Sequence, residues 1–441
     1  MSKKYKFLDE KLGGAVGMRT EESIQITTLK NGLRVATDTM PGAESVVVGA
    51  WVGVGTRHEP WNANGVAHLV EHMMFKGTKT RSAYALSTAI ENKGGSMNAH
   101  TTREETAYYA RMLPEDAETA TDLIGDMLRR SVFDEKELDR ERQVIIQEIG
   151  RDLDSPEDCI FELMHDRAFP KQKIGRSILG TADVIARLPR AAILDYVTRY
   201  YTAANMVLVA SGKITHADFV GMVRKRFASL PVGVRPRYEK ARVSYGMARG
   251  ERETEQTHLI LGFAGPGYLA KETYYPAQVL SVILGGSASS RLYQKVREKR
   301  GLVYAVSAAH GGFSDAGIFQ IYAGTDPARL RELIPVVCDE LNDLKRNVGP
   351  GELARAKAQI RADLLMGEES VMRRAERIGH QILAYGQTIP TEDILKRLMD
   401  VSQEDVQKAA ARLFARRPIV TALGPLGELE SYKDIAARLR G

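Results

Sequence analysis

The chain contains 441 residues, of which 44% are hydrophobic and 27% are charged. This composition is typical of a folded globular protein and excludes a disordered, collagen-like or coiled-coil chain, and the length indicates about three domains. The formal net charge of +6 is too small to predict nucleic acid as a partner.

The sequence also bears on compartment and membrane association. The two cysteines, Cys159 and Cys338, are far apart in the chain, which excludes a disulfide framework and suits a reducing compartment. The longest apolar stretch, at 46–54, is much shorter than a membrane span, and the basic N-terminus has no apolar core of a secretory signal. We therefore expect a cytoplasmic protein with no membrane partner.

The first half of the chain alternates strands and helices. Asn31-Gly32 separates two β-rich runs and predicts a hairpin that begins near residue 24. The nearly all-apolar run 45–56 predicts a strand covered on both faces. The patterns that follow predict helices at 66–75, 82–93, 114–129 and 134–153, a strand pair over 96–112, a strand within 200–212 and a helix at 216–230.

A similar pattern restarts after the proline-containing segment 231–247, which predicts a linker. The sequence at 113–128 resembles that at 325–341, and 137–149 resembles 352–364 at a similar offset. A repeat of this length indicates a duplicated domain rather than a solenoid, although two amphipathic helix pairs can also be alike by chance. The predicted division is a tail at 1–23, a domain at 24–230, the linker, and a homologous domain at 248–441.

The motif that carries chemistry is His68-Leu69-Val70-Glu71-His72, an HxxEH sequence. In a helix, His68 and His72 lie one turn apart on one face, where both can bind one zinc ion. Glu71 stands beside them and can accept a proton from a water that such an ion activates. A pair of hydrogen-bonded core histidines is the plainer interpretation, but this spacing is the inverzincin signature. We therefore predict one zinc ion per chain.

Two histidines leave a catalytic zinc one protein ligand short. Glu141 and Glu148, in the predicted helix 137–153, are seven residues apart and share one face. One of them can bind the metal while the other orients a histidine or the first carboxylate. Charged helix faces are usually solvated, and only the HxxEH motif makes an acidic ligand from this helix necessary.

The sequence resembles the pitrilysin or insulinase-type metallopeptidases, in particular their processing-peptidase branch, over nearly its whole length. In that family a glutamate ligand follows about 76 residues after the second histidine, which implies Glu148 as the third ligand and Glu141 as a second acidic residue near the site. The family also implies that Asn98 and Ala99 lie on an edge strand that pairs with a peptide substrate, and that Arg297 and Tyr304 face the substrate carbonyl.

Without this resemblance, Asn98 and Ala99 would be read as part of an ordinary half-buried hairpin, Arg297 as solvated and Tyr304 as core. The second half has no HxxEH, and the repeat places Asp363 where the first half has Glu148. We therefore expect one catalytic half and one supporting half. The fold class implied is α+β, with two homologous domains, each a mainly antiparallel sheet backed by helices, that form half of a clamshell chamber.

The function implied is that of a zinc-dependent endopeptidase for peptides or unfolded segments, in a homodimer or in a heterodimer with a homologous subunit. In this scheme His68, His72 and Glu148 bind zinc, and Glu71 is the general base and acid. Glu141 supports the site. The alternative is a non-catalytic structural subunit of the same fold, which the intact HxxEH motif disfavours.

Overall fold

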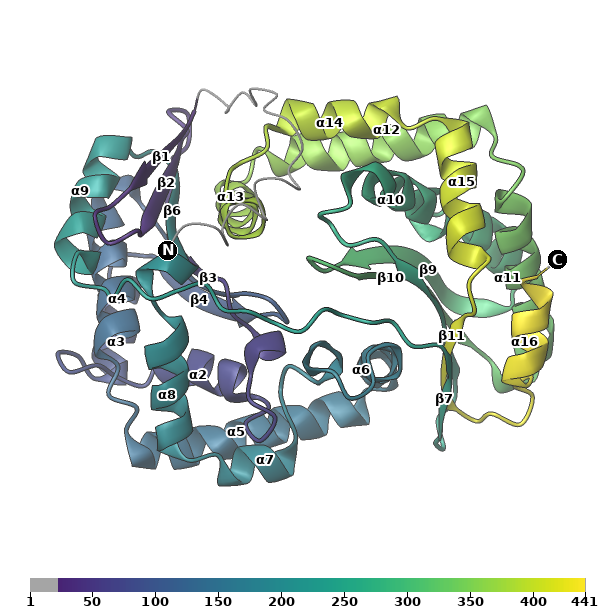
Figure 1. The fold of residues 1–441 in the computed structure, drawn as a ribbon, viewed down its shortest axis with the longest axis horizontal. Coiled ribbons are helices and arrows are strands. Elements are labelled where there is room, and N and C mark those ends of the chain that lie inside the picture. Colours follow the sequence, from purple (N-terminus) through teal and green to yellow (C-terminus); the bar gives the residue numbers. More distant parts are fainter. Residues whose placement is uncertain (1–22, 441) are drawn as a thin grey trace, which may run out of the picture.

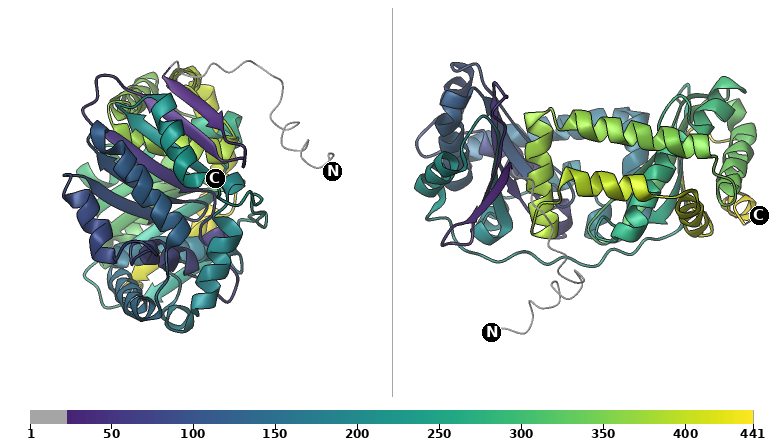
Figure 2. Two further views of the ribbon diagram at one scale, coloured as in Figure 1. Left: turned by 90° about the vertical axis from the view of Figure 1, so that its left-hand side faces the viewer. Right: turned by 90° about the horizontal axis from the view of Figure 1, so that it is seen from above.

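The computed structural model describes residues 23–440, so nearly all of the expected tail at 1–23 lies outside the described residues. The described chain forms two α+β halves that lie side by side along its longest axis (Figures 1 and 2). No helix in this part of the chain is long and apolar enough to cross a membrane.

The first half is built on a six-stranded sheet with the order β1-β2-β6-β3-β5-β4. All neighbouring pairs are antiparallel except β2 and β6, which are parallel. The predicted hairpin is confirmed, and its turn places Gly32 at φ +87°. The strands are β1 (Ile24–Thr28), β2 (Arg34–Thr39), β3 (Val46–Val52), β4 (Ser96–Thr101), β5 (Thr106–Met112) and β6 (Met206–Gly212).

The second half repeats this topology without a counterpart of β1. Its sheet has the order β7-β11-β8-β10-β9, again with a single parallel pair, β7 with β11. The equivalent order and direction of five strands confirm the duplication that the repeated sequence predicted. The strands are β7 (Gly246–Glu251), β8 (Thr257–Gly265), β9 (Val303–Gly312), β10 (Gly317–Thr325) and β11 (Ile419–Gly424).

The helices also follow the same order in the two halves. The first half contains α2 (Val66–Met74), α3 (Ala83–Glu91), α4 (Ala117–Arg130), α5 (Glu135–Asp154), α6 (Pro156–Ala168), α7 (Ala182–Arg187), α8 (Arg190–Tyr200) and α9 (His216–Phe227). The second contains α10 (Lys271–Gly285), a π-helical turn at Tyr293–Glu298, α11 (Leu330–Leu344), α12 (Pro350–Gly367), α13 (Val371–Tyr385), α14 (Thr391–Asp400), α15 (Gln403–Phe414) and α16 (Tyr432–Arg438).

Two expected boundaries differ from the structure. The helix expected at 114–129 begins as a 3₁₀ turn, Pro114–Asp116, and becomes α-helical only at Ala117. The linker expected at 231–247 overlaps β7, because Gly246 and Met247 pair with Ile419 and Val420 of β11. The strand conformation of these two residues depends on their pairing with a distant segment, and the local sequence pattern does not separate them from the linker.

Each sheet has an outer face covered by helices of its own half and an inner face covered by one helix of the other half. The helix α13 packs on β3 and β6 of the first sheet, and α6 packs on β8 and β11 of the second (Figure 1). Every residue of β3 is buried, which confirms the prediction of a strand covered on both faces. The two halves therefore exchange one helix reciprocally.

A buried ionic cluster joins the halves beside this exchange. Arg57, which is 2% exposed, pairs with Glu104 of the first half at 2.6 Å and with Asp315 of the second at 2.8 Å. Its guanidinium also lies 3.9 Å from the ring centre of Tyr238 in the connecting segment. The segment between the halves thus takes part in their contact.

The exchange can be tested at Gly379, where α13 crosses the first sheet. A Cβ at Gly379 would lie 2.5 Å from the Trp51 ring, and overpacking of this kind costs about 1–3 kcal/mol. We expect Gly379→Ala to lower the denaturant midpoint for unfolding. The matched control is Gly221→Ala in α9, where a Cβ meets nothing within 4 Å and alanine favours the helix by up to about 1 kcal/mol. Equal midpoints for the two variants would contradict the packing described.

Candidate metal centre

The HxxEH motif forms the middle of α2, as predicted. His68 and His72 lie one turn apart on the same face, with ring centres separated by 4.6 Å. Their side chains are 12% and 18% exposed, because the opposite face of α2 packs into the core of the first half. The two imidazoles therefore point away from the apolar core and toward α5.

Glu148 of α5 completes a group of three potential metal ligands. Its Oε2 lies 3.9 Å from Nε2 of His68 and 3.6 Å from Nε2 of His72. Within the described residues, this is the one group of three His, Cys, Asp or Glu side chains whose ligand atoms all lie within 4.8 Å of one another. Zinc–ligand bonds of about 2.0–2.1 Å in a tetrahedron separate the ligand atoms by roughly 3.4 Å, so this donor set fits zinc.

His68 is held as a neutral imidazole. Burial, with the nearby His72 adding to it, lowers the pKa of His68 to about 4. Nδ1 of this ring is buried and has no hydrogen-bond partner in the described part of the protein. A neutral imidazole is the form that binds a metal, so the environment of His68 favours the ligand state.

Glu141 of α5 orients the second histidine. Its Oε2 lies 3.0 Å from Nδ1 of His72. Its Oε1 forms an ion pair with Nζ of Lys76, at 2.7 Å. Burial lowers the pKa of His72, but the hydrogen bond to Glu141 and the charges of Glu148 and Glu71 outweigh it and raise that pKa. A carboxylate on Nδ1 leaves Nε2 directed at a metal, the usual arrangement behind a histidine ligand.

Glu71, the residue before His72 in α2, lies close enough to His72 and Glu148 for their charges to affect its pKa. Its Oε2 accepts a hydrogen bond from Oγ1 of Thr101, a residue of β4. Burial raises the pKa of Glu71, and the hydrogen bond from Thr101 opposes this only in part. A carboxylate with a raised pKa beside a group of metal ligands is suited to accept and return a proton.

Asn98 and Ala99 lie on β4, which forms an edge of the first sheet as expected. Asn98 is exposed, and its Oδ1 accepts a hydrogen bond from the N–H of Ala99 at 2.8 Å. Because β5 is the one strand that pairs with β4 among residues 23–440, the outer backbone groups of β4 have no strand partner there and can accept an added strand. The same strand supplies Thr101, so the free edge begins beside Glu71.

Arg297 and Tyr304 belong to the other half and are not brought to the metal group within this chain. Tyr304 is 65% exposed on β9, and the Arg297 guanidinium lies 4.8 Å from the ring centre of Tyr293. Neither makes a hydrogen bond or ion pair with the three ligands in the described chain. Tyr304 is thus not in the core, the position that its residue type without the family resemblance would indicate.

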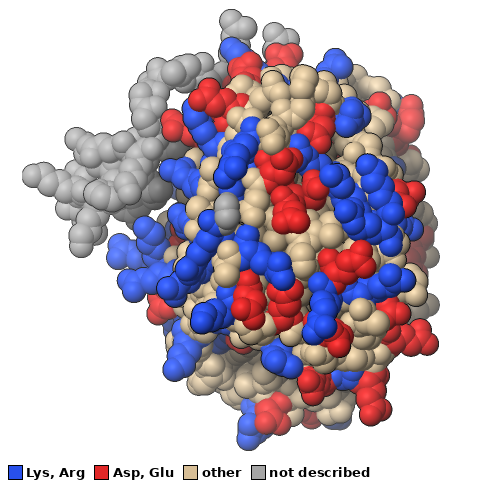
Figure 3. All heavy atoms as spheres, turned by 90° about the vertical axis from the view of Figure 1, so that its right-hand side faces the viewer, with Lys and Arg blue, Asp and Glu red and all other residues tan. Residues whose placement is uncertain are grey.

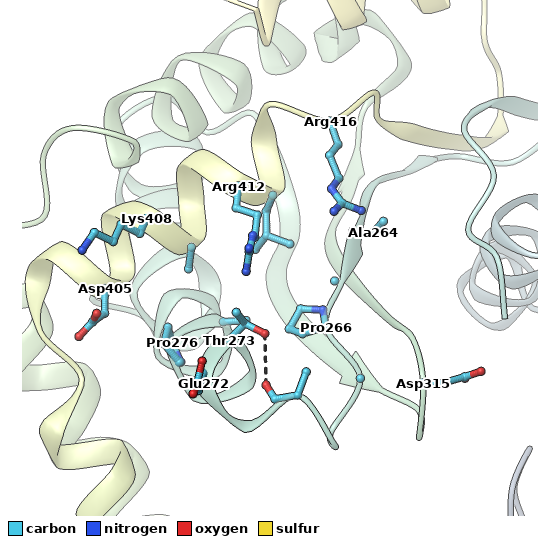
Figure 4. A pocket seen from close by; sticks show the side chains of 16 residues that line it. Ala264, Pro266, Glu272, Thr273, Pro276, Asp315, Asp405, Lys408, Arg412 and Arg416 are labelled. Atoms are coloured by element: carbon cyan, nitrogen blue, oxygen red, sulfur yellow. Dashed lines mark hydrogen bonds between the residues drawn. The ribbon is translucent and has the colours of Figure 1, made fainter. Parts of the chain in front are cut away.

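The second half, as far as residue 440, contains no equivalent group of potential ligands. Asp363 of α12 is 80% exposed and lies 3.4 Å from Arg373. A hollow of about 740 Å³ lies elsewhere in this half, between α10, α15 and the end of β8, with Arg412 and Arg416 directed into it (Figure 4). None of its lining residues is a ligand of the metal group.

The end of the second half that faces the viewer in Figure 3 carries charges of both signs. On the face in Figure 3, Lys and Arg side chains are interspersed with Asp and Glu rather than gathered in one basic area. This mixture agrees with the small net charge of +6.

Two residues beside the centre, Lys76 and Thr101, and one residue that contacts the start of α2 were not found from the sequence. Lys76 is one turn after His72 and Thr101 is on the same face of β4 as Ala99, so helix and strand periodicity could have indicated both. Glu59, which contacts the start of α2, precedes Gly65 by six residues. No standard capping pattern has this spacing.

Comparison with known proteins places both halves in one family. Residues 34–182 match the model described as "Insulinase (Peptidase family M16)", and residues 187–360 match "Peptidase M16 inactive domain". An uncharacterized zinc protease of Rickettsia felis is 36% identical over 405 residues, which cover 92% of this chain and 98% of the relative. One from Bacillus subtilis is 36% identical, covering 92% and 99%.

Solved structures show the same fold at lower identity. A protease from Helicobacter pylori has a TM-score of 0.85 at 22% identity, covering 91% of this chain and 99% of that one. A chain of complex III from Candida albicans has a TM-score of 0.84 at 21% identity, covering 94% and 99%. With its two matching domains and full-length relatives, this chain belongs to peptidase family M16, the insulinase family.

Proposed function

We propose that the chain is a zinc-dependent endopeptidase that hydrolyses peptides or unfolded segments bound in extended form. The observation that carries the proposal is the convergence of His68, His72 and Glu148, with Glu71 beside them. The names of the relatives, which call them zinc proteases, support the same chemistry.

In this proposal three residues would hold the metal, one transfers protons and one orients a ligand. His68, His72 and Glu148 would hold the ion, which would lower the pKa of a water and polarise the scissile carbonyl. Glu71 accepts the proton of the attacking water and returns it to the leaving amine. Glu141 keeps Nε2 of His72 directed at the centre through its contact with Nδ1.

Substrate binding would use the free edge of β4. An extended peptide added beside Asn98 and Ala99 would continue the sheet toward Glu71, with affinity from backbone hydrogen bonds and little demand on side chains. The clamshell chamber, of which this chain would form half, would need two chains in a homodimer or a heterodimer. In it, Arg297 and Tyr304 of one chain would face the centre of the other and stabilise the developing oxyanion.

A non-catalytic role has less support. The likeness to a complex III chain, at 21% identity, concerns the fold alone. A purely structural subunit has no use for a neutral His68, a raised-pKa Glu71 and a carboxylate behind His72 in one place. The conjunction of these three features favours catalysis.

The metal assignment predicts different defects for two glutamates. Glu71→Gln should retain zinc and lower kcat by about 10²–10⁴-fold, because the proton acceptor is lost while the ligands remain. Glu148→Gln should instead lower the zinc content. Elemental analysis and a peptide-cleavage assay decide, with Asp152→Asn on the next turn of α5 as the control. Full zinc and normal activity in the Glu148 variant would remove this residue from the site.

Strand pairing predicts selection by substrate conformation. A peptide can add to β4 only if its backbone is extended, so unstructured peptides should be cleaved and a stably folded protein should not. The measurement compares cleavage of one protein in native form and in a permanently unfolded form by mass spectrometry. A chelator should abolish cleavage of the unfolded form. Efficient cleavage of the native form would contradict the proposed binding mode.

The two-chain arrangement predicts rescue between inactive variants. Glu71→Gln and Tyr304→Phe chains should each form nearly inactive dimers. In a random mixture of homodimers and mixed dimers, roughly one quarter of the sites regain both groups if Tyr304 acts on the partner's centre. Co-expression with two different tags verifies that mixed dimers form. No recovery in verified mixed dimers would show that Tyr304 does not act across the interface.

A further inference from the structure

The helix that carries the HxxEH motif has no side-chain cap of its own. The first N–H groups of any helix have no partner within the helix. At the start of α2 the capping position is Gly65, which has no side chain and adopts φ +90°. The first turn of α2 contains His68, so whatever satisfies these N–H groups also determines where this histidine stands.

The missing cap comes from Glu59, six residues before Gly65. Oε2 of Glu59 accepts hydrogen bonds from the N–H of Gly65 and from Nδ2 of Asn64, both at 2.9 Å. Oε1 accepts a hydrogen bond from the N–H of Ala67 at 2.8 Å. Both carboxylate oxygens are therefore used at the helix start, where the helix dipole also favours a negative charge.

Keeping the carboxylate of Glu59 charged at this buried position costs free energy. Glu59 is fully buried, and burial raises its pKa to about 7 despite the hydrogen bonds of Ala67, Asn64 and Gly65 and the charge of Arg176. The nearest guanidinium nitrogen, Nη2 of Arg176, is 3.6 Å from Oε2. A serine or aspartate at position 65 would be the usual, less costly cap. Residues that violate a local rule at a cost are expected where function requires them.

Position 65 cannot carry a side chain, because the segment 176–180 packs directly on the helix start. A Cβ at Gly65 would lie 2.6 Å from the carbonyl oxygen of Leu179, and one at Gly180 would lie 2.5 Å from that of Asn64. Nδ2 of Asn64 also donates to the carbonyl of Ser177 at 3.0 Å. This close approach both excludes a local cap and leaves Glu59 as the group that fixes the first turn.

We propose that Glu59 is a positioning residue of the metal centre, which sets the place of His68 by holding the first turn of α2. Two ligands come from α2 and the third, Glu148, comes from α5. The distance from Glu148 to His68 therefore depends on how α2 is anchored at its start. His72, one turn later, has Glu141 behind it, whereas Nδ1 of His68 has no partner in the described chain. Glu59 restrains the position of His68 through the backbone of the first turn, whereas the ring of His68 has no such restraint at Nδ1 in the described chain.

This proposal rests on metal binding at the proposed centre and not on peptidase activity, so its test measures zinc affinity. Glu59→Gln keeps the shape of the side chain but places an amide NH₂ against one of the backbone N–H groups. We expect the zinc dissociation constant, measured by competition with a chromophoric chelator, to rise about tenfold or more, in the range found for residues that support a ligand indirectly.

The matched control is Asp38→Asn. Asp38 is also fully buried, and its carboxylate pairs with Arg374 of α13, at 2.7 Å for one contact, away from α2. Both variants should lower the unfolding temperature of the metal-free protein, but Asp38→Asn should leave zinc affinity within about twofold of the original. Equal affinity in the two variants would reduce Glu59 to a structural residue and overturn the proposal.

A second variant and a spectroscopic readout keep the test decisive. Glu59→Asp keeps the charge but shortens the reach, so it should fold and show a smaller loss of affinity in the same direction. With Co²⁺ in place of zinc, Glu59→Asp should also change the visible absorption of the metal, since the position of His68 alters the coordination. Unchanged affinity and spectrum in this variant would overturn the proposal. Absence of zinc binding by the unaltered protein would instead overturn the metal centre itself.

Discussion

The structure depends on covering two apolar sheets on both faces. β3 is buried along its whole length, and its inner face is covered by α13 from the far half, while α6 does the same for β8. Because only Ser155 separates α5 from α6, the turn that sends α6 across to the second half also fixes the end of α5. Glu148 lies on that helix, so the exchange that joins the halves helps to place the third metal ligand.

The candidate centre gathers groups from three elements, and each element is held by a different physical restraint. α2 is held at its start by a buried carboxylate, α5 by its continuation into α6, and β4 by its ladder with β5. The loop between β4 and β5 carries Glu104, which pairs with Arg57 and accepts a hydrogen bond from the N–H of Ser314 at 2.9 Å. The second half therefore supports the geometry of the first without contributing a ligand.

Local patterns in the sequence predicted the features that depend on short spacings. The pair His68 and His72, the face shared by Glu141 and Glu148, and the buried strand β3 all follow from helix or strand periodicity, and the duplication follows from two repeated helix pairs. The exchange of α6 and α13 and the pairing of Arg57 with Asp315 join residues far apart in the chain, and no local pattern encodes them. The role of Glu59 was missed for a related reason, since its contacts depend on a loop shape that only the folded chain reveals.

The reciprocal exchange bears on the origin of the repeat. A single ancestral unit with this topology would have exposed the apolar inner face of its sheet, and its own crossing helix would have had nothing to cover. Two copies of such a unit would cover both sheets by trading these helices, as the two halves of this chain do. Within one chain the trade lets α13 of the second half cover the first sheet, although all three potential metal ligands come from the first half. At the position that the sequence repeat aligns with Glu148, the second half carries Asp363, which is 80% exposed.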